Sequence, residues 1–144
     1  MSKSNSPEKK YQLVISSEIE NIEKVESFTE KISKLLNFSE DERDRIAIAV
    51  TEAVNNAIIH GNKLDPRKSV YIDISAVRGG IQIVVKDEGE GFDLDAVPNP
   101  LAPENLLKES GRGIFILKSL MDKVQYDFSR GGTQVTMIKF KNKR

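Results

Sequence analysis

The sequence contains no cysteine and only one histidine among its 144 residues. Without cysteine the chain can form no disulfide, carry no catalytic thiolate and bind no cysteine-ligated zinc, and a single histidine leaves little for any other zinc site. A metal bound by this chain is therefore expected to be a hard cation held by oxygen ligands.

An excess of charge of one sign and long apolar runs are also lacking. Lys and Arg balance Asp and Glu at 22 each, so no positive excess indicates a nucleic-acid partner. No apolar run approaches the roughly 20 residues that cross a bilayer, and the polar start of the chain lacks the apolar stretch of a signal peptide. We predict a cytoplasmic protein that contacts neither nucleic acid nor membrane directly.

The length and the apolar pattern predict one domain. Residues 1–10 are polar and basic and predict a disordered tail, which leaves residues 11–144 for the domain. The pattern then predicts a strand at 11–16, two helices, a hairpin, a long glycine-rich loop at 87–113, a helix at 114–121 and a closing hairpin. This order predicts an α+β fold, a two-layer sandwich with helices on one face of a mixed, mainly antiparallel sheet.

Capping signals mark where the first two helices begin and end. Ser17 with Glu20, and Ser39 with Glu42, have the spacing of a capping box. The first helix is expected to end near residue 37, and the second at Gly61, which we predict as its C-cap.

The second helix carries polar residues on one face. Glu52, Asn56 and His60 are spaced at i, i+4 and i+8 and so share a side of the helix. An amide oxygen can bind Mg²⁺ while a neighbouring carboxylate accepts a proton from water or a hydroxyl. Taken alone, the pair is equally typical of a solvated helix face, and His60 suits a structural role at a helix C-terminus.

Glycines gather around acidic and basic residues farther along the chain. Asp87 ends an apolar strand, and Gly89 and Gly91 permit a tight turn and close approach of a flat ligand. The Asp87 carboxylate could accept a hydrogen bond from an amino group of such a ligand, for example that of adenine. The run Ser110-Gly111-Arg112-Gly113 leads into a helix, whose free N–H groups favour phosphate oxygens, and Thr133 follows two glycines at a hairpin tip. Each of these segments on its own is also typical of an ordinary turn.

In their order along the chain, four segments resemble the N box and glycine boxes of the GHKL ATPases. They are EAVNNAIIHG at 52–61, DEGEGF at 87–92, Gly111-Arg112-Gly113 and Gly132-Thr133. The short loop between the glycine boxes, and Gly-Arg-Gly-Ile-Phe in place of the histidine-kinase sequence, are similar to the anti-sigma-factor serine/threonine protein kinases of that superfamily. The resemblance covers nearly everything after residue 10.

The resemblance implies the Bergerat (GHKL) fold, ATP and Mg²⁺ as ligands, and a role for each matching residue. Glu52 would be the catalytic base, Asn56 the Mg²⁺ ligand, and Asp87 the acceptor for the adenine amino group, supported by Thr133. The remaining residues expected at the nucleotide are Gly89, Gly91, Lys108, Gly111, Arg112 and Gly113.

The resemblance further implies a homodimer that sequesters a sigma factor and phosphorylates a STAS-domain anti-sigma factor antagonist. One departure from the pattern keeps a second hypothesis open, because Glu109 stands where some relatives carry an arginine for the γ-phosphate. The alternative is a nucleotide-gated binding module without kinase turnover, in which ATP orders residues 93–110 as a lid. A module that phosphorylates histidine is the third hypothesis.

Overall fold

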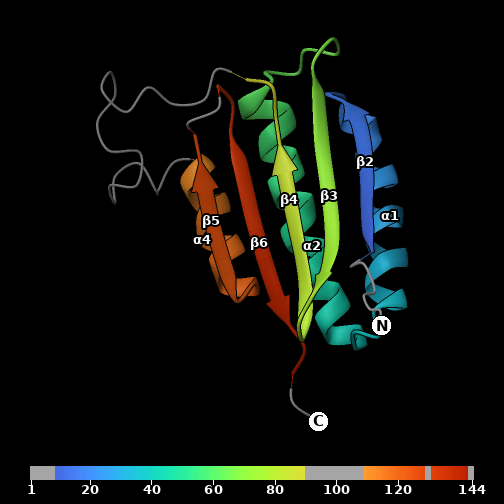
Figure 1. Cartoon of the computed structure of the whole chain (residues 1–144). Helices are drawn as coiled ribbons and strands as arrows, with labels where there is room; N and C mark the ends of the chain where they lie inside the picture. The colour runs from blue at the N-terminus through green and yellow to red at the C-terminus, as the bar shows by residue number, and fades with distance from the viewer. Residues whose placement is uncertain (1–8, 90–108, 129–130, 143–144) are drawn as a thin grey trace.

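The computed structural model describes residues 9–89, 109–128 and 131–142, except for the side chains of residues 109–114. Its elements follow one another as β2 (Lys10–Ser16), η1 (Ile19–Asn21), α1 (Ile22–Leu35), α2 (Glu40–Asn56), η2 (Ala57–Gly61), β3 (Ser69–Val77), β4 (Gly80–Lys86), α4 (Glu109–Leu120), β5 (Lys123–Asp127) and β6 (Gln134–Phe140). Helices and strands form two layers (Figure 1). The predicted α+β sandwich is confirmed.

Five strands form one sheet in the order β2-β3-β4-β6-β5. All four pairings between the described strands are antiparallel. The prediction of a mixed sheet allowed for parallel pairs, and none is found among these strands. Both predicted hairpins are present, and Gly79 at the first and Gly131 at the second have the positive φ values that tight turns need.

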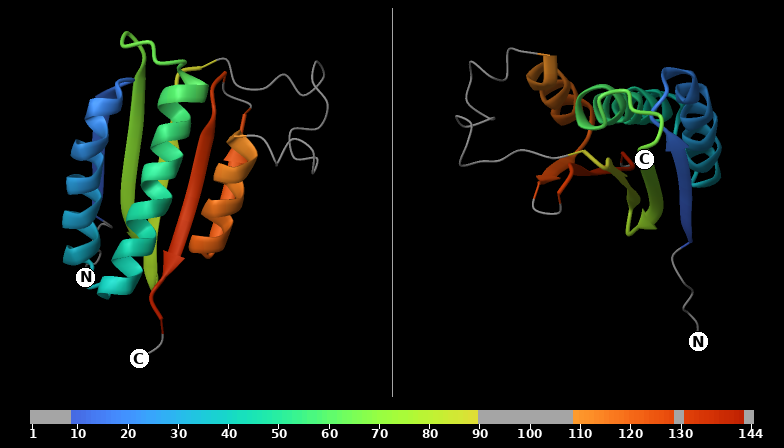
Figure 2. Two further views of the ribbon diagram at one scale, coloured as in Figure 1. Left: turned by 180° about the vertical axis from the view of Figure 1, so that it is seen from behind. Right: turned by 90° about the horizontal axis from the view of Figure 1, so that it is seen from above.

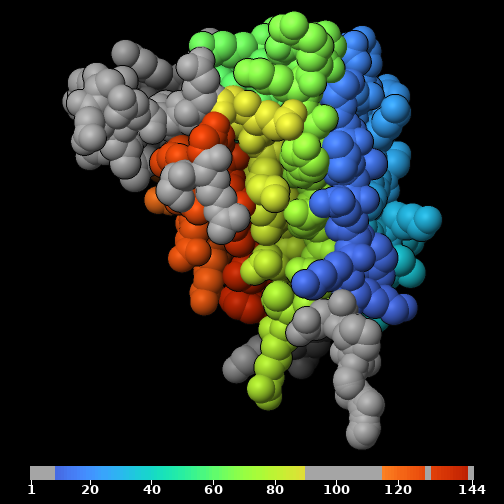
Figure 3. Space-filling model, turned by 45° about the horizontal axis from the view of Figure 1, so that its top comes forward, coloured from blue at the N-terminus to red at the C-terminus, as the bar shows by residue number. Residues whose placement is uncertain are grey.

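Helices α1, α2 and α4 cover one face of this sheet (Figure 2). Alternate strand residues point towards them and are fully buried, as the period of two requires, among them Ile72, Ile83 and Met137. No described helix covers the other face, whose strands lie open in the space-filling view (Figure 3). None of the helices in the described ranges is long and apolar enough to span a membrane.

The second capping box is formed as predicted, and it reaches the other end of the chain. Ser39 accepts from the N–H of Glu42, and Glu42 accepts from the N–H of Ser39 at 2.9 Å. The second carboxylate oxygen of Glu42 accepts from the N–H of Asn142 at 2.6 Å, so the start of α2 holds the segment that follows β6.

The first capping box and the last helix boundary were predicted wrongly. Ser17 is fully buried and donates its hydroxyl to the carbonyl of Lys68, while η1 begins after Glu18. Helix α4 begins at Glu109, five residues before the predicted start at 114, so Gly111, Arg112 and Gly113 lie within its first turns. Glycine lowers helix propensity but does not forbid a helix, which is why the sequence placed the start too late.

Gly61 ends the helical segment as predicted, but it is not a left-handed cap. After Asn56 the α-helix continues into one π-helical turn, η2, and the residue that follows Gly61 has helical backbone angles. Gly61 is absent from the residues with positive φ. Its lack of a side chain serves a different purpose, which depends on Asp87.

Candidate functional site

The predicted site is centred on Asp87, where two loops meet at the end of β4. One carboxylate oxygen of Asp87 accepts from the backbone N–H of Gly89 at 2.9 Å and from that of Thr133 at 3.0 Å. The backbone N–H of Asp87 in turn donates to the carbonyl of Thr133 at 3.0 Å. Thr133 therefore contacts Asp87 through its main chain, whereas the resemblance implied support through its hydroxyl or a shared water.

Three glycines approach Asp87 so closely that none could carry a side chain without movement. A Cβ on Gly61 would lie 2.1 Å from the other carboxylate oxygen of Asp87. A Cβ on Gly132 would lie 2.5 Å from the carbonyl oxygen of Asp87, and one on Gly89 would lie 2.1 Å from the carbonyl of Gly61. The predicted segments 52–61, 87–92 and 132–133 therefore converge on one carboxylate.

Burial raises the pKa of Asp87 above its usual range, although the N–H groups of Thr133 and Gly89 and the charge of Lys68 oppose the shift. The carboxylate keeps one oxygen engaged by backbone donors and presents the other beside Gly61. A partly dehydrated acceptor of this kind suits a neutral N–H donor such as an amino group on a heterocycle.

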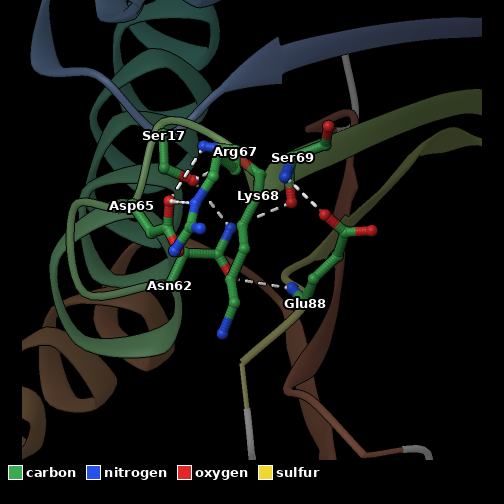
Figure 4. A network of polar contacts seen from close by, with 7 residues as sticks. All are labelled: Ser17, Asn62, Asp65, Arg67, Lys68, Ser69 and Glu88. Carbon is green, nitrogen blue, oxygen red and sulfur yellow. Dashed lines mark hydrogen bonds and ion pairs between the residues drawn. The ribbon is translucent and has the colours of Figure 1, made fainter.

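Behind the Asp87 loop lies a polar cluster that the sequence did not reveal (Figure 4). Asn62, which is 1% exposed, donates to the Ser17 hydroxyl at 2.7 Å and to the Ser69 carbonyl at 2.9 Å. Its amide oxygen accepts from the backbone N–H of Glu88 at 2.8 Å. The Glu88 carboxylate accepts from the N–H of Ser69 and from the hydroxyl of Tyr71.

Glu52 and Asn56 lie on α2, one turn apart and both half-buried. Neither side chain forms a hydrogen bond or ion pair with another residue in the described ranges. Burial raises the pKa of the Tyr126 phenol, on the helix-facing side of β5, and the nearby charge of Glu52 raises it further. The Tyr126 hydroxyl is buried without a partner in the described structure.

The remaining predicted residues are placed only in part. Gly111, Arg112 and Gly113 belong to the first turns of α4, which packs beside α2 (Figure 2). Gly91, Lys108 and the predicted lid up to residue 108 lie outside the described residues, as does most of the predicted tail. His60 lies in η2 and is exposed, at the helix end where a structural role was predicted.

A pocket of about 210 Å³ adjoins Asp87 on the sheet face that carries no described helix. Its lining comprises Tyr71, Lys86, Asp87, Gly132, Thr133 and Gln134. Glu52 and Asn56 belong to the helical layer, so this pocket does not join them to Asp87. We assign it no part in the predicted site.

The residues present fit a magnesium ion that is bound together with phosphates. No cluster of three or more His, Asp or Glu able to hold a metal occurs among the described residues. Mg²⁺ usually keeps several waters and takes one or two protein ligands beside the phosphates of its substrate. The half-buried amide of Asn56 is a sufficient oxygen ligand for that arrangement.

Helices on one face of an antiparallel sheet, with a carboxylate at the end of β4 packed against glycines of three loops, define a histidine kinase-like ATPase domain. The family model of that description matches residues 15–139. The chain therefore belongs to this family, as the four segments predicted.

The relatives identify the branch of the family. The chain is 31% identical over 117 residues to the serine-protein kinase RsbW of Bacillus subtilis, covering 77% of this chain and 72% of the relative. It is 39% identical over 104 residues to the anti-sigma F factor of Oceanobacillus iheyensis, covering 69% and 70%. These names confirm the predicted class, an ATP-binding anti-sigma regulator with serine kinase activity.

Solved structures agree on the fold. A Mycobacterium tuberculosis structure containing RsbU and RsbW domains superimposes with a TM-score of 0.69 at 16% identity, covering 94% of this chain and 33% of that one. The catalytic domain of the histidine kinase ThkA gives a TM-score of 0.56 at 16% identity, covering 94% and 97%.

Proposed function

We propose that this chain binds Mg-ATP with its adenine at Asp87 and transfers the γ-phosphoryl group to a serine or threonine of a STAS-domain anti-sigma factor antagonist. We further propose that it sequesters a sigma factor. The observation that carries the nucleotide assignment is the convergence of Gly61, Gly89 and Gly132 on the Asp87 loop, whose partly buried carboxylate keeps one oxygen without a hydrogen bond to a described residue.

The helical layer supplies groups for the chemistry. In the transfer, the acceptor hydroxyl oxygen bonds to the γ-phosphorus, the bond to the β–γ bridging oxygen breaks, and ADP leaves. The hydroxyl proton passes to Glu52, which is half-buried and makes no hydrogen bond in the described structure. Bound Mg²⁺ would neutralise phosphate charge, with Asn56 as its protein ligand.

The spacing of residues along α2 fits a nucleotide that binds with its adenine at Asp87, beside Gly61, and with its phosphates near Asn56 and Glu52. At 1.5 Å per residue, and rather less across the π-helical turn Ala57–Gly61, Asn56 lies roughly 7 Å and Glu52 roughly 13 Å along the helix from Gly61. The adenine end and the phosphate end of one nucleotide are separated by a comparable length, so one side of α2 can serve both. Gly111, Arg112 and Gly113, at the start of α4, are proposed to lie against the phosphates, with Lys108 and Gly91 completing the site.

The alternative is a nucleotide-gated binding module without turnover. The sequence favours it at Glu109, where some relatives carry an arginine for the γ-phosphate, because a carboxylate cannot supply the charge neutralisation that transfer needs. The two functions share the Asp87 site and differ only in whether phosphate is transferred.

We also propose a cytoplasmic homodimer, as the resemblance implies. The sheet face without a described helix supports a second copy as its cover. Two large apolar side chains of its strands β2 and β6, Val14 and Phe140, are 48% and 36% exposed.

The test is incubation of the protein with γ-labelled Mg-ATP and candidate STAS-domain proteins, followed by identification of the phosphoamino acid. Glu52→Gln should abolish phosphoserine or phosphothreonine, a loss of at least about a hundredfold for a general base, while nucleotide binding is kept. Glu40→Gln, an exposed carboxylate on the same helix, is the matched control and should behave as wild type. Binding without transfer in wild type would favour the alternative, and phosphohistidine would contradict both.

A further inference from the structure

Asn62 has all three of its side-chain hydrogen bonds directed at different segments. It contacts Ser17, which follows β2, Ser69 at the start of β3, and Glu88 in the loop after β4 (Figure 4). A buried carboxamide can make four hydrogen bonds, so this side chain is nearly saturated. Removing a side chain buried to this degree lowers the free energy of unfolding. The location of its partners indicates a second role, at the nucleotide site.

The Glu88 contact bears directly on the proposed nucleotide site. Glu88 directly follows Asp87 in the chain, and its backbone N–H donates a hydrogen bond to the amide oxygen of Asn62. On the other side, Gly61, the neighbour of Asn62 in sequence, touches the free oxygen of Asp87. Gly61 therefore restricts where the Asp87 carboxylate can lie, and Asn62 holds the peptide group between Asp87 and Glu88 in place.

We propose that Asn62 is a positioning residue for purine recognition: its hydrogen bond to the Glu88 N–H sets where the Asp87 carboxylate points and so determines preference for adenine. The inference rests on the proposed function, because it concerns the same Asp87 site. Asn62 touches no nucleotide and acts through Asp87.

The readout is the ratio of affinities for ATP and inosine triphosphate. The two ligands share ribose and phosphates, but inosine carries an oxygen where adenine carries the amino group. A hydrogen bond to a charged acceptor should give wild type a preference for ATP of about tenfold or more. A loss of overall stability alone would not change this ratio in protein that remains folded.

Two variants separate positioning from stability. Asn62→Ala removes the acceptor for Glu88, and we expect the ATP preference to fall by about tenfold, mainly through weaker ATP binding. Ser17→Ala removes another member of the same cluster, including its bond to Lys68, but leaves the Asn62 contact with Glu88. It should lower the melting temperature while the ATP preference stays at the wild-type value.

Calorimetry on the full chain, at a temperature where circular dichroism shows each variant folded, gives both affinities. An Asn62→Ala protein that is folded and retains the wild-type preference would overturn the inference, and so would an equal loss in Ser17→Ala. If wild type bound neither nucleotide, the proposed function itself would fail. Asp87→Asn further separates a failure of the inference from a failure of the proposed function, because it should lose the preference for ATP even with Asn62 intact.

If Asn62→Ala does not fold, amide hydrogen exchange on the unmodified protein tests the same contact. The Glu88 N–H lies in a loop and its residue is exposed, so without the Asn62 bond it should exchange at the rate of an open amide. We expect clear protection in the nucleotide-free protein, and exchange without protection would overturn the inference.

Discussion

Replacement of Gly61 by alanine tests the convergence on Asp87 most directly. The new Cβ would lie 2.1 Å from the carboxylate oxygen and 2.4 Å from the carboxylate carbon of Asp87. Non-bonded carbon contacts are comfortable only near 3.5 Å or beyond, so the carboxylate must retreat by about 1 Å. It cannot do so without straining its hydrogen bonds from Gly89 and Thr133.

The expected cost is in ligand affinity. A misplacement of about 1 Å in a positioned group can reduce its effect by roughly a hundredfold. We therefore expect ATP affinity, measured by calorimetry, to fall by one to two orders of magnitude, about 1.4 to 2.7 kcal/mol. The helix itself should tolerate alanine, because Gly61 has no positive φ and alanine favours helices.

Gly79→Ala is the matched control. Gly79 has a φ of 75° and nothing within 4 Å of an added Cβ, so alanine there adds backbone strain without a contact. It should lower stability by roughly 1 to 2 kcal/mol and leave ATP affinity unchanged. Wild-type ATP affinity in Gly61→Ala would refute a role for this close contact in binding, and so would losses of affinity in both variants that follow their losses of stability.

Two further predictions concern ionisable side chains near the site. The pKa of Asp87 is raised above its usual 3.8 in the folded chain, so the folded state binds more protons and the free energy of unfolding falls as pH rises from that value through the folded-state pKa. Asp87→Asn should remove this decline and melt at or above wild type at pH 7, and a lower melting temperature there would contradict the account. Tyr126→Phe should raise stability by up to about 1 kcal/mol in thermal melts, because it removes a buried hydroxyl without a described partner. A destabilised Tyr126→Phe would mean that the hydroxyl is bonded in solution.

Patterns between near neighbours predicted the fold well. Alternation of apolar residues gave the strands of both hairpins, and the Ser39–Glu42 spacing gave the start of α2, because these features depend on residues within a few positions. Ser17 had the same spacing to Glu20, but its hydroxyl is used by Lys68, which lies 51 positions away. No local pattern distinguishes the two serines.

The site shows the same contrast between features set by near neighbours and features set by residues far apart in the sequence. The motifs pointed to Asp87 and Thr133, and the structure brings these two residues into contact through the backbone N–H of Thr133. Asn62 follows directly after the predicted segment and was overlooked, because an asparagine after a helix-ending glycine is typical of an exposed turn. Its importance depends on Glu88 and Ser69, and their proximity requires the folded sheet.

The strand order has a consequence for synthesis and truncation. Of the described strands, β6 is made last but lies between β4 and β5, so β4 has an unpaired edge until β6 emerges from the ribosome. That edge belongs to a run of isoleucine and valine, the kind of edge that pairs with other chains. Truncated chains that end before Phe140 should therefore aggregate, and an intact β6 protects the centre of the sheet.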